Sequence, residues 1–206
     1  MFITFEGGEG SGKTTIIEMI EKYLKEKKID VLVTREPGGS IIAEQIRNVL
    51  LDPNNKAMTH RTEALLYAAS RAQHIDEVIR PALESNRFVI CDRYLDSSLS
   101  YQGYARDLGF DYIKRINHYA LNYLPDLTFY IDLDPSIGKQ RVMKNRSSKV
   151  DRLDLEAIKF HELVREGYLK IAKEEPNRII VIDGNRPIES IFNEIIKKVD
   201  EVVCAT

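Results

Sequence analysis

Residues 7–14 read Gly-Gly-Glu-Gly-Ser-Gly-Lys-Thr, a complete G-x-x-x-x-G-K-[ST] phosphate loop. A short apolar run, Phe2–Phe5, stands directly before this loop, and Thr15–Ile20 begins a helical pattern directly after it. Glycines let the backbone wrap closely around a polyphosphate, and the N-terminus of the following helix adds partial positive charge. The strand, loop and helix together predict a binding site for a nucleoside triphosphate. Lys13 is expected to reach the β- and γ-phosphates, and the Thr14 hydroxyl to ligate Mg²⁺.

Composition limits the possible partners of the chain. Its 206 residues include 30 basic and 32 acidic side chains, so the net charge is −2. A nucleic-acid-binding protein usually has a basic surplus, and no apolar run approaches the roughly twenty residues that span a bilayer. We therefore expect neither nucleic acid nor a membrane as partner. Two cysteines without metal-site spacing, Cys91 and Cys204, and an N-terminus without a signal-peptide pattern favour a cytoplasmic enzyme with free thiols.

Apolar runs typical of β-strands recur along the chain and alternate with helical patterns. The runs are Phe2–Glu6, Val31–Thr34, Phe88–Asp92, Leu127–Asp132 and Ile179–Asp183. Nearly continuous apolar strands are typical of a parallel sheet that helices cover on both faces. The alternation predicts an α/β fold with three layers and about five parallel strands, formed by residues 1–206 as a single domain. The segment Arg141–Arg152 interrupts the helical pattern and is interpreted as a mobile basic lid.

Charged residues stand at or directly after the ends of three predicted strands, namely Glu6, Arg35 and Asp92. Asp92 closes the strand that begins at Phe88, a position from which a carboxylate can reach the Mg²⁺ of a phosphate-loop enzyme. Asp132 and Asp134 are rivals for this role. Asp92 is favoured because Arg93 beside it can bind phosphate, whereas Asp134 and the following proline indicate a helix-entry turn.

Tyr67 and Arg71 lie four residues apart and therefore share one face of a predicted helix. An aromatic ring beside a guanidinium can stack on a base and hold it or its phosphate. Taken alone, these two residues are better explained as an ordinary surface cation–π pair. Arg47 flanks apolar positions of its helix, so packing of its aliphatic portion over those positions would explain it without a ligand.

Read in order, these segments resemble the bacterial type of the thymidylate kinase family. The resemblance depends on Phe5–Gly7 with the phosphate loop, Thr34–Gly39, Thr62–Arg71, Asp92–Ser98, Tyr101–Gly103 and Asp151–Asp154. It covers nearly the whole chain and implies a phosphate-loop kinase fold and transfer of the ATP γ-phosphate to dTMP. It also implies a homodimer. Alternatives are a kinase for another nucleoside monophosphate and, from a different class, a GTP-dependent switch, which the absence of a suitable Asn-Lys-x-Asp run disfavours.

The resemblance also implies site residues. ATP would contact Gly7, Gly8, Glu9, Gly10, Ser11, Gly12, Lys13, Thr14 and Thr15, with Thr14 and Asp92 on Mg²⁺. For dTMP, Arg71 would pair with thymine and Tyr67 would stack on it, while Arg47 and Arg93 would grip the phosphate. Ser97 and Gln102 would hydrogen-bond around the nucleotide, and Tyr101 would crowd the sugar 2′ position. Glu36 would lie near the sugar or the metal, and Glu9 near the sugar 3′-hydroxyl.

Catalysis would depend on Lys13, Asp92, Arg93 and arginines of the lid, with Arg146 and Arg152 as the candidates. Some family members have an arginine inside the phosphate loop, at the place of Gly10 in this chain. A cation that arrives when a lid closes acts mainly on the transition state, because charge spreads over the transferred oxygens. The basic lid is therefore expected to supply the cation that Gly10 cannot.

Overall fold

The computed structural model describes residues 1–144 and 151–203 of the chain. Five parallel strands form one sheet in the order β2-β3-β1-β4-β5. The strands are β1 (Phe2–Gly7), β2 (Val31–Arg35), β3 (Phe88–Asp92), β4 (Leu127–Asp132) and β5 (Ile179–Asp183). Their bounds agree with the predicted runs to within one residue, so the predicted α/β sheet is confirmed.

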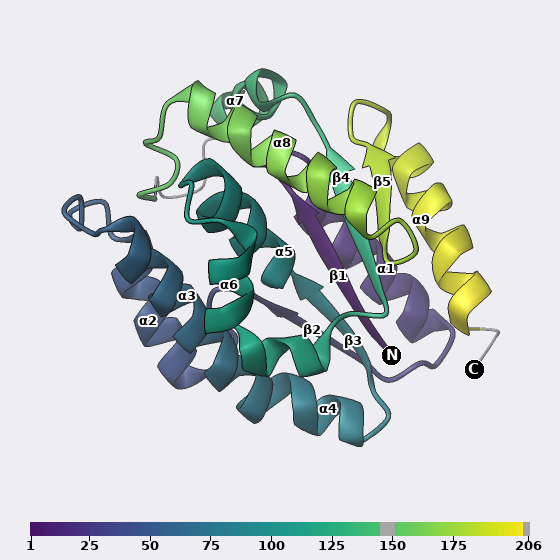
Figure 1. Ribbon diagram of the computed structural model, residues 1–206. Coiled ribbons are helices and arrows are strands. Elements are labelled where there is room, and N and C mark those ends of the chain that lie inside the picture. The colour runs from purple at the N-terminus through teal and green to yellow at the C-terminus, as the bar shows by residue number, and fades with distance from the viewer. Residues whose placement is uncertain (145–150, 204–206) are drawn as a thin grey trace.

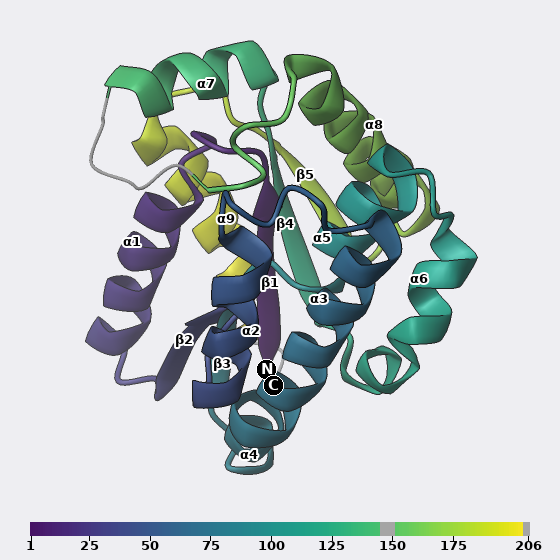
Figure 2. The same cartoon turned by 90° about the vertical axis from the view of Figure 1, so that its left-hand side faces the viewer.

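Helices alternate with the strands. They are α1 (Lys13–Glu26), α2 (Ile41–Leu51), α3 (His60–His74), α4 (Arg80–Glu84), α5 (Leu95–Ser98), α6 (Phe110–Ile116), α7 (Pro135–Lys144), α8 (Ile158–Glu174) and α9 (Ile188–Val203). Less regular helical turns span Ile75–Ile79, Leu99–Ala105 and His118–Tyr123. Figures 1 and 2 show α1 and α9 on one side of the sheet, and α3, α5, α6 and α8 on the other.

Two buried apolar clusters hold these three layers together. Successive strand residues point to opposite faces of the sheet. Ile90 of β3 accordingly packs into the cluster under α1 and α9, while its neighbour Cys91 packs into the cluster under α3 and α8. The same alternation separates Phe129 from Tyr130 in β4. Both faces of the sheet are covered, which explains why its central strands carry apolar side chains on both faces.

The strand order places the phosphate loop at the centre of one sheet edge. β1 lies between β3 and β4, with β2 beyond β3 and β5 beyond β4. In the parallel register Phe5 is the partner of Asp92, so the end of β3 lies beside the start of the loop. Ligands of open α/β sheets bind at the carboxyl ends of the strands, where the strand order switches sides. The fold therefore brings Asp92 and the phosphate loop together, as predicted.

The predicted basic loop is wrong at its N-terminal end. α7 continues to Lys144, so Arg141 and Lys144 are helical rather than part of a loop. Residues 139–144 are mostly good helix formers, and they extend the helix that begins at Pro135. The next helix begins at Ile158. Arg146 lies outside the described residues.

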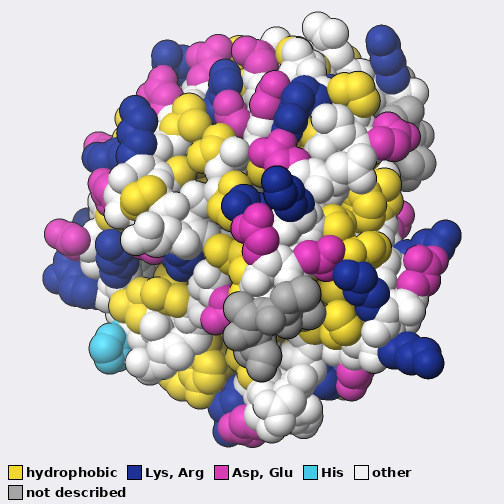
Figure 3. All heavy atoms as spheres, turned by 90° about the vertical axis from the view of Figure 1, so that its right-hand side faces the viewer, with side chains coloured by type: hydrophobic (Ala, Val, Ile, Leu, Met, Phe, Trp, Pro, Cys, Tyr) yellow, Lys and Arg dark blue, Asp and Glu magenta, His cyan; other side chains and the backbone are white. Residues whose placement is uncertain are grey.

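The distribution of charged side chains on the surface agrees with the small net charge of the chain. Basic and acidic side chains are interspersed on the face of the molecule shown in Figure 3, with apolar side chains among them. Across residues 1–144 and 151–203, no helix combines the length and the apolar character needed to cross a membrane. Cys91 is fully buried in β3.

Candidate functional site

The phosphate loop connects the end of β1 to the first turn of α1. Gly12 has a φ of 93°, a left-handed conformation that glycine adopts without strain. The ammonium of Lys13 donates hydrogen bonds to the carbonyls of Gly7 at 3.0 Å and Gly8 at 3.1 Å. Burial, together with the nearby charge of Arg93, lowers the pKa of Lys13 to about 8. The lysine is therefore held inside the curve of the loop, where a phosphate chain would meet it.

Gly10 has a packing role as well as a conformational one. A Cβ atom at Gly10 would lie 2.4 Å from the carbonyl oxygen of Gly138 in α7. An arginine at position 10 would therefore displace α7. The same helix places a different cation beside the loop, because Arg141 donates to the carbonyl oxygens of Gly10 and Gly184, each at 3.3 Å. Arg141 thus lies beside the loop, and the contact of a lid cation with the triphosphate stays a prediction.

Asp92 has the free oxygen that a metal ligand needs. Its Oδ1 is buried and has no hydrogen-bond partner within residues 1–144 and 151–203. Among the charges that act on Lys13, Asp92 raises the pKa of the ammonium, so the two groups are close. The rivals are occupied: Asp132 accepts two hydrogen bonds from Arg165 at 2.7 and 2.8 Å, and Asp134 accepts from Ser136 at the start of α7. A buried carboxylate oxygen without a partner fits Mg²⁺, which prefers oxygen ligands.

A cavity of about 140 Å³ lies beside Asp92. Its lining includes every residue expected to bind dTMP, which are Glu36, Arg47, Tyr67, Arg71, Arg93, Ser97, Tyr101 and Gln102. These side chains come from the loop after β2, from α2 and α3, and from the segment after β3. The structure thus brings together in one cavity eight residues that are spread over 67 positions of the sequence, from 36 to 102.

Arg71 is almost completely buried and is held in a fixed orientation. Its Nε donates to Glu36 at 2.7 Å, and its terminal nitrogens donate to Asn117, to Ser98 and to the Tyr94 carbonyl. These four bonds leave one of the five N–H donors of the guanidinium for a ligand. The second oxygen of Glu36 lies 3.0 Å from Nδ1 of His74. Glu36, expected beside the sugar or metal, thus acts in this structure as the counter-ion that orients Arg71.

Arg93 lies between the phosphate loop and the cavity. Its backbone has a φ of 68°, uncommon for a residue with a side chain and frequent at functional sites. The guanidinium lies 5.3 Å from the centre of the Tyr101 ring. It also donates to Ser97 Oγ and to the Tyr168 hydroxyl, each at 3.3 Å. These contacts turn a cation toward the cavity.

Glu6 and Tyr168 support Arg93, and neither was predicted from the sequence as a site residue. The Tyr168 hydroxyl donates to Glu6 at 2.6 Å and lies 2.9 Å from Ser97 Oγ. Glu6 also accepts hydrogen bonds from Ser97 Oγ and from the backbone N–H of Tyr94 and Ser97. Burial raises the pKa of Glu6 to about 7. Glu6 was visible as a charge inside an apolar strand, but nothing in the pattern of α8 distinguished Tyr168 from other core aromatics.

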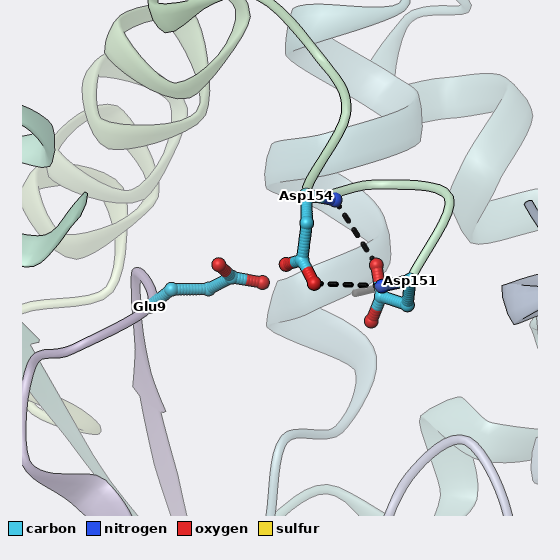
Figure 4. A group of neighbouring side chains, drawn as sticks. All are labelled: Glu9, Asp151 and Asp154. Atoms are coloured by element: carbon cyan, nitrogen blue, oxygen red, sulfur yellow. Dashed lines mark hydrogen bonds between the residues drawn. The ribbon is translucent and has the colours of Figure 1, made fainter. Parts of the chain in front are cut away.

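A second acidic group lies across the phosphate loop. Ligand atoms of Glu9, Asp151 and Asp154 lie within 4.8 Å of one another, and Figure 4 shows the three carboxylates gathered around one point. Asp154 Oδ1 is buried without a hydrogen-bond partner in the described part of the chain. Burial and the closeness of Asp154 raise the pKa of Glu9 to about 8. These residues could hold a divalent cation. Glu9 comes from the phosphate loop and the two aspartates from the segment before α8, so the fold makes them neighbours.

Arg152, the predicted lid arginine that lies within the described residues, already has protein partners in this structure. Arg152 is buried and donates to the Glu63 carboxylate at 2.6 Å and to the Leu50 carbonyl at 2.9 Å. In this structure it therefore bridges the C-terminal end of the lid to α2 and α3, and its contact with ATP stays a prediction. Arg47 donates to the Pro37 carbonyl at 2.7 Å and lines the cavity.

Comparison with known proteins agrees with this geometry. The sequence profile of the family described as "Thymidylate kinase" matches residues 5–195. The chain belongs to the thymidylate kinase family. It is 60% identical over 199 residues to a thymidylate kinase of Acholeplasma laidlawii, covering 97% of this chain and 98% of the relative. It is 55% identical over 195 residues to one of Clostridium novyi, covering 94% and 95% of the two chains.

A solved structure gives the same result for the fold. The crystal structure of thymidylate kinase from Ehrlichia chaffeensis superposes with a TM-score of 0.79 at 34% sequence identity, and the match covers 97% of this chain and 98% of that one. The predicted resemblance and the three-layer phosphate-loop fold are both confirmed.

Proposed function

We propose that the described site transfers the γ-phosphate of ATP to dTMP and releases dTDP and ADP. The observation that supports this most strongly is the position of Asp92 and Arg93. Asp92 ends β3 and Arg93 follows it, both act electrostatically on Lys13 of the phosphate loop, and both line the 140 Å³ cavity. A donor held by the loop and an acceptor held in the cavity would therefore meet at one charged junction.

On the donor side, the backbone of residues 7–15 would cradle the triphosphate, and Lys13 would bind its β- and γ-phosphates. The buried Asp92 oxygen and the exposed Thr14 hydroxyl would hold Mg²⁺. When bound, Mg²⁺ neutralises charge on the β- and γ-phosphate oxygens. Phosphoryl transfer needs little covalent chemistry from the protein, so positioning and charge compensation are the main tasks of these residues.

On the acceptor side, Tyr67 would stack on thymine and the remaining N–H of Arg71 would donate to it. Arg47 and Arg93 would bind the phosphate of dTMP, aided by the Ser97 hydroxyl. Tyr101 would fill the space beside the sugar 2′ position. Because Glu6 and Tyr168 fix Arg93 before the substrate arrives, the site loses little orientational freedom on binding.

The lid would complete the site. Arg146 or Arg152 would contact the transferring phosphate on closure, and Arg141 already lies beside the loop at Gly10. Closure would also exclude water, which otherwise competes with dTMP for the phosphoryl group.

Lys13→Ala tests the placement of the chemistry. We expect phosphorylation of dTMP to fall below detection while the far-ultraviolet circular dichroism remains that of the unaltered protein. Lys22→Ala is the matched control, because Lys22 is an exposed residue of the same helix. If Lys13→Ala keeps the activity of Lys22→Ala, the loop does not take part in the reaction.

Assembly and location are further proposals. We propose a homodimer that uses exposed apolar side chains of α2 and α3, among them Ile41 at 81%, Val49 at 46% and Leu65 at 51% exposure. Sedimentation at micromolar concentration tests this, and a monomer mass would contradict it. A cytoplasmic location agrees with a buried thiol at Cys91.

A further inference from the structure

Glu63 is a buried carboxylate that the mechanism above does not use. It lies in the first turn of α3 and is 1% exposed. Its Oε2 accepts hydrogen bonds from Arg152 at 2.6 Å and from Arg106 at 3.3 Å. Its Oε1 accepts from Nε2 of Gln102 at 2.9 Å and from Nε of Arg106 at 3.4 Å. Burial alone would raise the pKa of Glu63, but Arg106, Gln102 and Arg152 outweigh it and hold the pKa below its usual value.

An ionised carboxylate can only accept hydrogen bonds, so it determines which end of the Gln102 amide faces it. The Gln102 side chain must turn its NH₂ group toward Glu63 and its carbonyl oxygen away. Gln102 is 1% exposed and lines the same cavity as Tyr67 and Arg71. Turning the amide over would bring two oxygens face to face in a buried place, which is costly.

We propose that Glu63 is a positioning residue that sets the choice of pyrimidine by fixing the Gln102 amide. The proposal rests on the proposed function, in which the 140 Å³ cavity holds the base of the acceptor nucleotide. In the fixed orientation Gln102 offers one carbonyl acceptor and one remaining N–H donor toward the base.

Thymine matches this pattern and cytosine does not. Thymine presents an N3–H donor next to the O4 acceptor, so a Gln102 carbonyl can receive the first and its N–H can reach the second. Cytosine presents an N3 acceptor next to an amino donor, which is the reversed pattern. Cytosine would therefore fit only a reversed amide, and the Glu63 carboxylate opposes that reversal. Arg71, a pure donor in the same cavity, acts in the same direction.

Glu63→Gln tests this proposal. The short bond from Arg152 would hold the new carbonyl oxygen at the Oε2 position, so the new NH₂ group would face Gln102 and favour the reversed amide. We expect the ratio of kcat/KM for dTMP to kcat/KM for dCMP to fall at least about tenfold, the size of effect that an unmatched buried polar group produces. The ratio for dTMP over dUMP should stay the same, because uracil has the same N3–H and O4 pattern as thymine.

Two variants separate the possible outcomes. Arg106→Gln removes an ion pair of Glu63 but leaves the Gln102 contact, so both substrate ratios should stay as in the unaltered enzyme. Gln102→Leu should lower kcat/KM for dTMP. If it does not, the base lies elsewhere and the proposed function of the cavity is wrong. If it does, while Glu63→Gln leaves the dTMP/dCMP ratio unchanged, only the role of Glu63 is overturned.

The orientation can also be measured in the unaltered enzyme, which covers the case that Glu63→Gln does not fold. With ¹⁵N-labelled glutamine side chains and dTMP bound, a nuclear Overhauser effect between the Gln102 amide protons and the Glu63 γ-methylene is expected. Amide protons of Gln102 that contact the base but not Glu63 would overturn the proposal.

Discussion

Replacing Tyr168 by phenylalanine removes one hydroxyl that connects three groups of the site. The hydroxyl lies 2.6 Å from a Glu6 oxygen, 2.9 Å from Ser97 Oγ and 3.3 Å from the Arg93 guanidinium. The phenyl ring keeps the stacking on Tyr130, whose centroid lies 4.6 Å away, so the change isolates the hydroxyl. Glu6 is fully buried but keeps three other hydrogen bonds.

The expected loss follows from these contacts. A hydrogen bond to a charged group contributes about 1.5–3 kcal/mol, so we expect the free energy of unfolding to fall by about 2 kcal/mol. Arg93 loses a longer and weaker contact, worth ~1 kcal/mol, so kcat/KM for dTMP should fall about fivefold. KM for ATP should not change, because the hydroxyl does not touch the phosphate loop.

Urea denaturation and steady-state kinetics measure the two effects. Tyr104→Phe is the control, because within the described part of the chain the Tyr104 hydroxyl has only an exposed 3.3 Å contact with Glu166. We expect this control to change stability by less than about 0.5 kcal/mol. A Tyr168→Phe variant as stable and as active as Tyr104→Phe would refute the role of Tyr168 in holding Arg93.

Three further changes probe the donor, the lid and the sugar. Lys13 must be protonated to bind phosphate, so kcat/KM for ATP should fall as the pH rises through about 8, and a profile that stays flat to pH 10 would contradict the buried lysine. Arg152→Ala should lower kcat far more than it raises KM for dTMP, whereas a loss of unfolding free energy alone would make Arg152 only a structural bridge to Glu63. Tyr101→Ala should relax discrimination against the 2′-hydroxyl, and unchanged selectivity for dTMP over its ribonucleotide would reject this role.

Local patterns were sufficient to predict the sheet and the phosphate loop. The loop motif depends on glycines at fixed spacing, and the central strands are apolar on both faces, so both features are visible in short windows of sequence. The carboxyl-end rule then placed Asp92 beside the loop, and the register of β1 with β3 confirms that placement.

Long-range polar contacts could not be predicted in the same way. Tyr168 lies 162 positions from Glu6, and a tyrosine inside an amphipathic helix gives no sign of its hydroxyl's partner. Arg152 had the charge of a lid residue, but its buried partner Glu63 lies 89 positions away in another helix. Arg141 was assigned to a loop because the basic run hid the good helix formers that extend α7.

A comparison of acceptors with one preparation of the enzyme tests directly whether the cavity selects dTMP. ADP release from ATP would be measured with dTMP, dUMP, UMP, dCMP and dGMP side by side. We predict the highest kcat/KM for dTMP and a preference over dUMP of about 10–200-fold, since one methyl group contributes roughly 1–3 kcal/mol. A higher kcat/KM for any of the other four acceptors would contradict the assignment of dTMP to this site.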